Sequence, residues 1–213
     1  MNPQSLPELT ELLLLKPETS RSDVAKACAQ ARQHGFRSVC VNGSRVIQAL
    51  ALLEETEVKI ATVVGFPLGA MDADAKRFET EAAVDNGAQE INVVLNIGWL
   101  KDGDPSSILR ELRDVIEAAD ERPVGVILET PLLTRDEKII ACHLIQESAA
   151  KAVVTCTGLA AGRAAVEDVK LLRQTLGAKF DITAAGGIFD TQSALVLIEA
   201  GATRIAIETG FIN

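Results

Sequence analysis

The sequence predicts one α/β domain over residues 1–213, folded as a single (β/α)8 TIM barrel. Eight short apolar segments recur along the chain, and most are rich in valine, isoleucine and leucine, as buried parallel strands are. Helical patterns lie between them, and no linker rich in proline, glycine or serine interrupts the alternation. Eight such units in 213 residues fit a closed barrel better than an open doubly wound sheet, which is the alternative.

The expected strands follow one another at similar spacing and end in small, polar or glycine residues. In chain order they cover residues 9–15, 37–42, 59–66, 90–96, 124–130, 152–158, 181–187 and 204–210.

Several expected helices carry clear boundary signals. The segment 104–120 has one apolar stripe at helical spacing, and Pro105 stands in its first turn, where a missing N–H is tolerated. Thr134 and Glu137 have the spacing of a capping box, and Asp190 is a suitable N-cap for a helix over 190–200.

Three helices are expected to end at a Gly-Ala pair, at residues 87–88, 177–178 and 201–202. Glycine readily takes the left-handed conformation that ends a helix. Each pair stands just before an expected strand, so the pairs mark helix-to-strand connections.

Composition excludes several classes of protein. A net charge of −9 argues against a nucleic-acid partner. No charged-then-apolar leader is present, and no apolar run is long enough to span a bilayer. The four cysteines form no CxxC pair, so neither a disulfide framework nor a zinc site is indicated. We therefore expect a reduced cytoplasmic protein without a metal or another cofactor.

In a TIM barrel the ligand site lies at the C-terminal ends of the strands. The pair Gly186-Gly187 follows the seventh expected strand. Such a turn lets backbone N–H groups approach a phosphate closely, or it serves only as a tight connection, and the sequence leaves both interpretations open.

These motifs resemble the deoxyribose-phosphate aldolase family, class I aldolases with a (β/α)8 barrel. The resemblance covers nearly the whole chain in order, and GFPLG and ETPLLT are its most specific pieces. It is carried by LLKP (14–17), SVCVN (38–42), VVGFPLGA (63–70), KRFE (76–79), NGAQEINVVLNIGWLKDGD (86–104), VILETPLLTRDEK (126–138), TCTG (155–158), AGRAAVEDVKLLR (161–173), AAGGI (184–188) and AGATRIAI (200–207). It implies a barrel that joins acetaldehyde to glyceraldehyde 3-phosphate through a lysine Schiff base.

The same resemblance places unexpected residues at the family's catalytic positions. Val154 stands where the family has its Schiff-base lysine, Thr183 where it has a second lysine that lowers the pKa of the first, and Asn92 where it has a proton-shuttling carboxylate. A valine has no lone pair with which to form an imine, and an asparagine cannot exchange a proton as a carboxylate does. No family catalytic residue is therefore intact, and we expect no aldol activity.

The first and last strands also depart from the family pattern. Glu11 replaces an aspartate of the first strand, and Glu208 replaces a serine that binds the substrate phosphate in the family. A glutamate there would repel an anion unless a cation lay close by. The substrate-binding candidates are residues at or near the strand ends, namely Cys40, Glu129, Thr155, Thr157, Gly158, Gly186, Gly187, Glu208 and Thr209.

No other lysine is a convincing substitute for the Schiff-base lysine. Lys179 lies four residues before Thr183, at the wrong end of its strand, and Lys151 faces away from the side that Val154 occupies. Lys16, Lys76 and Lys101 match family positions of their own and are expected in loops or ion pairs.

Other candidate chemistry has less support. Cys156 has no histidine at a strand end to activate it, because His34 and His143 fall in helices, so we expect a buried thiol. Glu129 and Glu208 could hold a hard cation only as a carboxylate site, without histidine support.

Three hypotheses remain. In the first, the chain is an aldolase homologue without aldol activity that acts as a small-molecule binding, regulatory or interaction protein. In the second, it is an enzyme with changed chemistry in the same pocket, using Glu129, Glu208 or Cys156. In the third, it is a structural subunit that pairs with an active family member. We favour the first and expect a homo-oligomer, with the second as the alternative.

Overall fold

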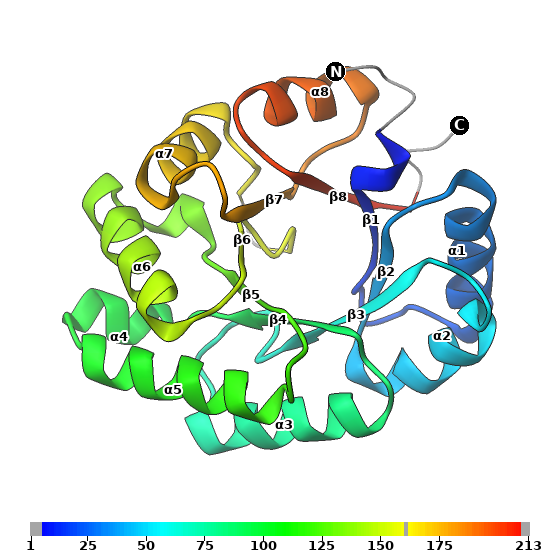
Figure 1. Cartoon of the computed structure of the whole chain (residues 1–213), viewed down its shortest axis with the longest axis horizontal. Coiled ribbons are helices and arrows are strands. Elements are labelled where there is room, and N and C mark those ends of the chain that lie inside the picture. Colours follow the sequence, from blue (N-terminus) through cyan, green and yellow to red (C-terminus); the bar gives the residue numbers. More distant parts are fainter. Residues whose placement is uncertain (1–5, 160–161, 210–213) are drawn as a thin grey trace.

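The computed structural model describes residues 6–159 and 162–209, and these form a closed parallel barrel with helices around it (Figure 1). The strands pair in chain order, and β8 returns to β1 to close the ring. They are β1 (Thr10–Leu14), β2 (Ser38–Val41), β3 (Lys59–Val64), β4 (Glu90–Val94), β5 (Val124–Ile127), β6 (Ala152–Val154), β7 (Asp181–Ala185) and β8 (Arg204–Glu208). The predicted TIM barrel is confirmed, and each strand lies within its predicted segment.

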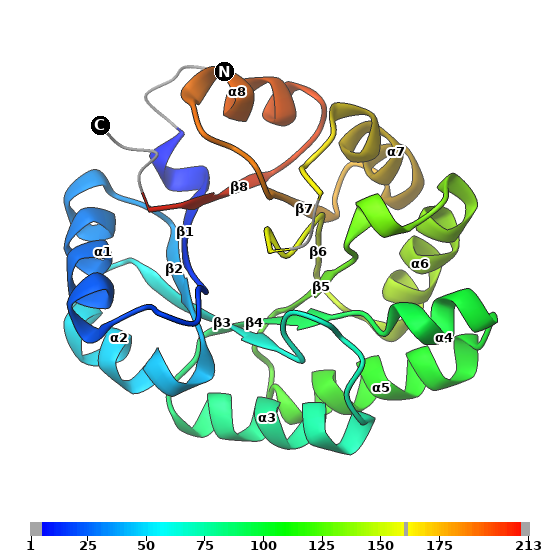
Figure 2. The ribbon, with the colours of Figure 1, turned by 180° about the vertical axis from the view of Figure 1, so that it is seen from behind.

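Helices cover the outside of this ring, as the reverse view also shows (Figure 2). The β4–β5 connection carries two helices, and within the described residues no helix follows β8. None of the described helices has both the length and the apolar character needed to cross a membrane. The helices are α1 (Arg21–His34), α2 (Val46–Leu53), α3 (Ala73–Asp85), α4 (Ile97–Asp102), α5 (Pro105–Ala118), α6 (Arg135–Ser148), α7 (Val166–Leu176) and α8 (Thr191–Glu199).

The core has two layers because successive side chains of a strand point to opposite faces of the sheet. Val153 packs in the large layer between the strands and the helices, whereas Val154 belongs to a small cluster inside the barrel. This inner cluster includes small residues such as Ala61, Ala185 and Ala206. The alternation therefore decides which residues of each strand can reach an interior site.

The predicted helix boundaries are largely confirmed. Thr134 and Glu137 form a reciprocal capping box at α6, and the Asp190 side chain accepts the Ser193 N–H at α8. The three glycines of the Gly-Ala pairs all have positive φ. Gly177 departs from the expected left-handed conformation, since its ψ is 173° and the chain leaves α7 in an extended direction.

Candidate functional site

Three small cavities meet at the C-terminal end of the barrel, and Leu13 of β1 lines all of them. The mouth cavity, about 140 Å³, lies at the ends of β1 and β8 and includes Lys16, Thr157 and Glu208 in its wall. The glycine-turn cavity, about 10 Å³, lies beside Gly186 and is also lined by Glu208. The interior cavity, about 10 Å³, lies inside the strands and has room for about one water molecule.

Val154 forms part of the wall of the interior cavity. Its side chain is 5% exposed and packs in the inner cluster with Ile127, its register partner on β5. Cys40 and Asn92 line the same cavity, and the described residues that line it include no lysine. This part of the barrel therefore offers an apolar wall with an amide, two thiols, a hydroxyl and the carboxyl of Glu11, but its described lining has no amine.

Asn92 and Thr183 also meet a fourth cavity, about 30 Å³, deeper in the barrel toward the N-terminal ends of the strands. Asn92 borders both this lower cavity and the interior cavity, whereas Thr183 lines only the lower one. Gly125 of β5 leaves room for the amide, because a β-carbon there would lie 2.5 Å from Asn92 Oδ1. Val154, Asn92 and Thr183 thus lie on adjoining interior cavities.

Of the three polar residues that follow β6, Cys156 and Thr157 line the site cavities and Thr155 does not. Thr155 lies outside the four cavities, and its hydroxyl donates to Ala185 O and accepts from Ala185 N, both at 2.9 Å. It therefore joins β6 to β7. Cys156 lines the interior cavity, where burial raises the pKa of its thiol to about 11. That thiol is protonated at neutral pH, which does not favour a role as nucleophile.

Glu129 holds the segment that follows β6 through a hydrogen bond to its backbone. Its side chain is buried, and Oε2 accepts the backbone N–H of Thr157 at 3.0 Å. Its φ of 51° is unusual for a residue other than glycine, and Oε1 is buried without a hydrogen bond. Glu129 is absent from the lining of the mouth and interior cavities, so its visible role is to position Thr157.

The glycines predicted to bind a ligand lie together at the ends of β6 and β7. Gly158, Gly186 and Gly187 all have positive φ and line the glycine-turn cavity together with Glu208. A β-carbon on Gly186 would lie 3.2 Å from Cys156 Cβ and 3.7 Å from Gly158 Cα. The close approach of these two strand ends, together with a φ of 99°, favours glycine at position 186.

A cation, Lys16, lies close to Glu208, as would be required for a phosphate to bind beside this carboxylate. Lys16 Nζ lies 2.9 Å from Glu208 Oε2, and this contact raises the pKa of Lys16. Thr209 is exposed and lines the same mouth cavity, as do Glu18 and Asp23. The mouth therefore carries three carboxylates against one ammonium group, which disfavours an anionic ligand.

The remaining lysines that match the family are occupied in ion pairs. Lys76 is fully buried, with its ammonium 2.7 Å from Glu111 and 2.9 Å from the Val94 carbonyl. Lys101 pairs with Glu137 at 2.7 Å. The expectation of ion-pair roles for Lys16, Lys76 and Lys101 is confirmed.

Glu11 is the site residue that the sequence reasoning did not include among its candidates. Its carboxyl is 4% exposed, lines both interior and lower cavities, and accepts a hydrogen bond from Ser38 Oγ at 2.9 Å. Burial, with help from the charge of Glu90, raises its pKa to about 7. The available signal was a single acidic residue in the apolar run TELLLL, on the same face as Leu13 and Leu15.

Metal-binding chemistry receives no support from the described residues, which contain no cluster of three or more histidine, cysteine, aspartate or glutamate side chains suited to an ion. All four cysteines are buried thiols. Burial and the neighbouring Glu11 raise the pKa of Cys40 well above its usual value.

Known proteins resemble this chain over nearly its whole length. The deoxyribose-phosphate aldolase of Alkaliphilus oremlandii is 49% identical over 90% of this chain and 87% of its own. Deoxyribose-phosphate aldolase 1 of Bacillus licheniformis is 47% identical over 92% of this chain and 88% of its own. The structure of the tetrameric deoxyribose phosphate aldolase of Aeropyrum pernix superposes with a TM-score of 0.91 at 26% identity, covering 99% of this chain and 89% of that one. The DeoC/LacD family aldolase profile matches residues 12–170. The chain therefore belongs to the DeoC/LacD aldolase family.

Proposed function

We propose that this chain is a cytoplasmic, aldolase-like protein that binds a small carbonyl or sugar-like molecule at the barrel mouth without forming a lysine Schiff base. The observation that carries the proposal is the absence of lysine from the described lining of the interior cavity, where Val154 stands in the family's lysine position. An imine needs an amine within reach of the bound carbonyl.

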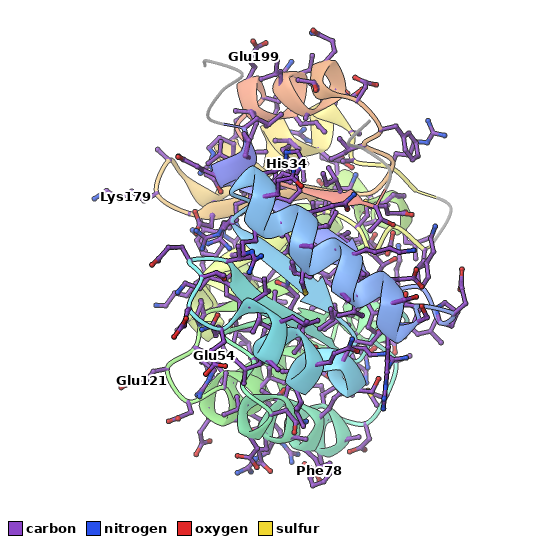
Figure 3. The ribbon with its side chains drawn as sticks, turned by 90° about the vertical axis from the view of Figure 1, so that its right-hand side faces the viewer. His34, Glu54, Phe78, Glu121, Lys179 and Glu199 are labelled. Carbon is purple, nitrogen blue, oxygen red and sulfur yellow. The ribbon has the colours of Figure 1, made fainter. Side chains whose placement is uncertain are left out.

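Contrary to the expectation from sequence, Lys151 reaches the lower cavity, although it does not line the interior one; the other nearby lysines support the proposal. Lys16 is held by Glu208 at the mouth, and Lys76 is enclosed with Glu111 outside the interior cavity. Figure 3 shows Lys179 on the same side of the molecule as Glu54 and Glu121, which also lie in helix-to-strand connections. That side is opposite the carboxyl ends of the strands, so Lys179 is remote from the mouth.

The charges at the mouth favour an uncharged ligand over a sugar phosphate. Glu208 borders both the mouth and the glycine-turn cavities, and its pairing with Lys16 occupies the nearest ammonium group. A phosphate beside Gly186 and Gly187 would have to compete with this carboxylate for Lys16. We therefore rank neutral carbonyl and polyol compounds above their phosphate esters.

Reductive trapping tests the absence of a Schiff base. The protein is incubated with deoxyribose 5-phosphate and borohydride, and peptide mass spectrometry is used to search for a reduced adduct on any lysine. We expect none, and an adduct on any lysine would overturn the proposal. The control is the Val154→Lys, Thr183→Lys, Asn92→Asp triple variant, in which we expect trapping at position 154.

Titration calorimetry with deoxyribose, glyceraldehyde and their phosphate esters tests the ligand class. Binding of the neutral compounds supports a binding role. Loss of that binding in a Thr157→Val variant would locate it at the C-terminal end of the barrel, because Thr157 lines both the mouth and interior cavities. If the folded protein binds none of these compounds, a structural role is favoured instead.

Self-association is a further part of the proposal. The Aeropyrum pernix relative is described as tetrameric, and the present chain exposes large apolar side chains on adjacent helices, including Ile47 of α2 and Phe78 of α3. Where such side chains form a contiguous patch, they mark protein–protein interfaces. Light scattering coupled to size exclusion should give a mass above that of one chain.

A second candidate is a lyase or another enzyme that acts on a small carbonyl or sugar-phosphate-like substrate by changed chemistry. It is favoured by Glu11, whose pKa near 7 and position on the interior cavity suit a general acid or base. Of the side chains considered from sequence, Cys156 is protonated and Glu129 is occupied with Thr157. This candidate predicts exchange of α-hydrogens of glyceraldehyde or dihydroxyacetone in heavy water, which NMR would detect in the native protein and not in Glu11→Gln.

A further inference from the structure

A surface groove adjoins the glycine-turn cavity, with which it shares Gly187 and Ile188, and it has no lining residue in common with the mouth cavity. It has a volume of about 330 Å³, within the range of small-molecule sites. Apolar side chains make up much of its wall, and Arg163 is the only charged residue among the described residues that line it, which are Arg163, Ala164, Val166, Gly187, Ile188, Gln192, Ser193, Val196 and Leu197. The groove thus combines an apolar surface with one cation.

Arg163 is held in place by two contacts. Its guanidinium carbon lies 5.6 Å from the centre of the Phe189 ring, a ring that is 63% exposed. Its aliphatic stem lies against Gly187, where a β-carbon would be 2.5 Å from Arg163 Cγ. A cation stacked on an aromatic ring loses less freedom when it binds a ligand, so this guanidinium is partly preorganised.

The donors of Arg163 remain available to a ligand. Within the described part of the chain, the guanidinium has no ion pair and no hydrogen bond, although the protein carries a net charge of −9. Ser193, at the start of α8, cannot donate to an anion in the groove, because its N–H and its hydroxyl both donate to the Asp190 carboxylate. Among the described side chains that line the groove, Arg163 is therefore the one that can pair with an anion.

We propose that this groove is a binding site for a small molecule with an apolar body and a terminal oxyanion, a carboxylate or a phosphate monoester, which pairs with Arg163. A planar guanidinium can donate two parallel hydrogen bonds to either group. The apolar body would lie against Val166, Val196 and Leu197. This site shares no lining residue with the mouth cavity and does not depend on the chemistry proposed there.

Titration calorimetry with benzoate, phenyl phosphate and benzyl alcohol tests the proposal. The two anions should bind, and the neutral alcohol should bind at least about tenfold more weakly, because it lacks the charge-assisted contact. Arg163→Ala should weaken anion binding by about tenfold or more, and Arg163→Lys should fall between, since it keeps the charge without the fork. The stronger of the two anions identifies the preferred head group.

The matched control is Arg135→Ala. Arg135 is another exposed arginine, located at the start of α6, and in the described structure it has no ion pair. Its loss should leave anion binding within about twofold. The proposal is overturned if neither anion binds at millimolar concentration, if Arg163→Ala binds as tightly as the native protein, or if both alanine variants weaken binding equally.

Discussion

The two ends of the barrel treat charge in opposite ways. At the N-terminal end Glu90 lies between two arginines, with Arg37 at 2.8 Å and Arg204 at 2.9 Å, and Arg204 continues to Asp181 at 2.9 Å. At the C-terminal end the only pair across the mouth within the described residues is the exposed Lys16–Glu208 contact, and the surrounding space is open. The first end is closed by matched charges, whereas the second keeps room for a ligand, as barrel enzymes generally do.

Glu11 lies where these two ends meet. It borders the lower cavity together with Glu90 and Arg204, and the interior cavity together with Val154 and Asn92. Its pKa is raised by burial and by Glu90, while Ser38, Arg204 and Arg37 oppose the rise. The charge network of the closed end therefore sets the protonation of a carboxyl that faces the open end.

The largest expected effect follows from Glu11→Gln. A carboxyl whose pKa rises from 4.5 unfolded to about 7 folded adds stability that is fully present below pH 4.5 and lost as the pH rises through about 7. Native stability should therefore fall by about 2.5 kcal/mol more than that of Glu11→Gln between about pH 5 and about pH 8. Urea unfolding at the two pH values measures this difference.

The control for that experiment is Glu8→Gln, which removes an exposed carboxylate from the turn before β1. Its stability should follow the native pH dependence. Equal pH dependence in the native protein and Glu11→Gln would contradict the assignment of a raised pKa to Glu11.

A smaller loss is expected for Glu90→Gln. It removes the only ion-pair partner that Arg37 has within the described residues, whereas Arg204 keeps Asp181, and a partly buried charge left without a partner is destabilising. Because Arg37 is one third exposed, water compensates in part, and we expect about 2 kcal/mol of destabilisation at neutral pH. Chemical unfolding measures it, with Glu147→Gln as the control.

Glu147 pairs with Arg113 on the surface, both more than half exposed, so its replacement should change stability by less than about 0.5 kcal/mol. Equal effects of the two substitutions would mean that the closed end is not a specific network. Glu90→Gln should also lower the pKa of Glu11, since it removes a neighbouring negative charge.

The strands and the helix caps could be predicted from the sequence, because both depend on the spacing of residues close together in the chain. The eight strands and the capping box of Thr134 and Glu137 follow from it, whereas the position of Val154 was suggested by the family resemblance. The roles of Thr155 and Glu129 did not follow. Thr155 faces away from the interior and bonds β7, and Glu129 turns back to hold Thr157, so both depend on neighbouring strands.

Glu11 shows the same limit more clearly. Its alternation with Leu13 places it inside the barrel, but its pKa depends on burial and on charges contributed by β4 and β8 and by Arg37 just before β2. These contacts join residues far apart in sequence. Local patterns can indicate where such a carboxyl points, and only the assembled barrel shows what surrounds it.

The smallest expected effect belongs to the open end. Lys16→Ala breaks the Lys16–Glu208 pair, but both side chains are well exposed, so solvent screens their attraction and stability should change by less than about 0.5 kcal/mol. The same variant should weaken binding of any phosphorylated compound at the mouth, because only carboxylates then remain among its charged lining residues. Thermal unfolding and calorimetry measure the two quantities. A stability loss as large as that of Glu90→Gln would mean that the mouth is closed by its ion pair in the same way as the opposite end.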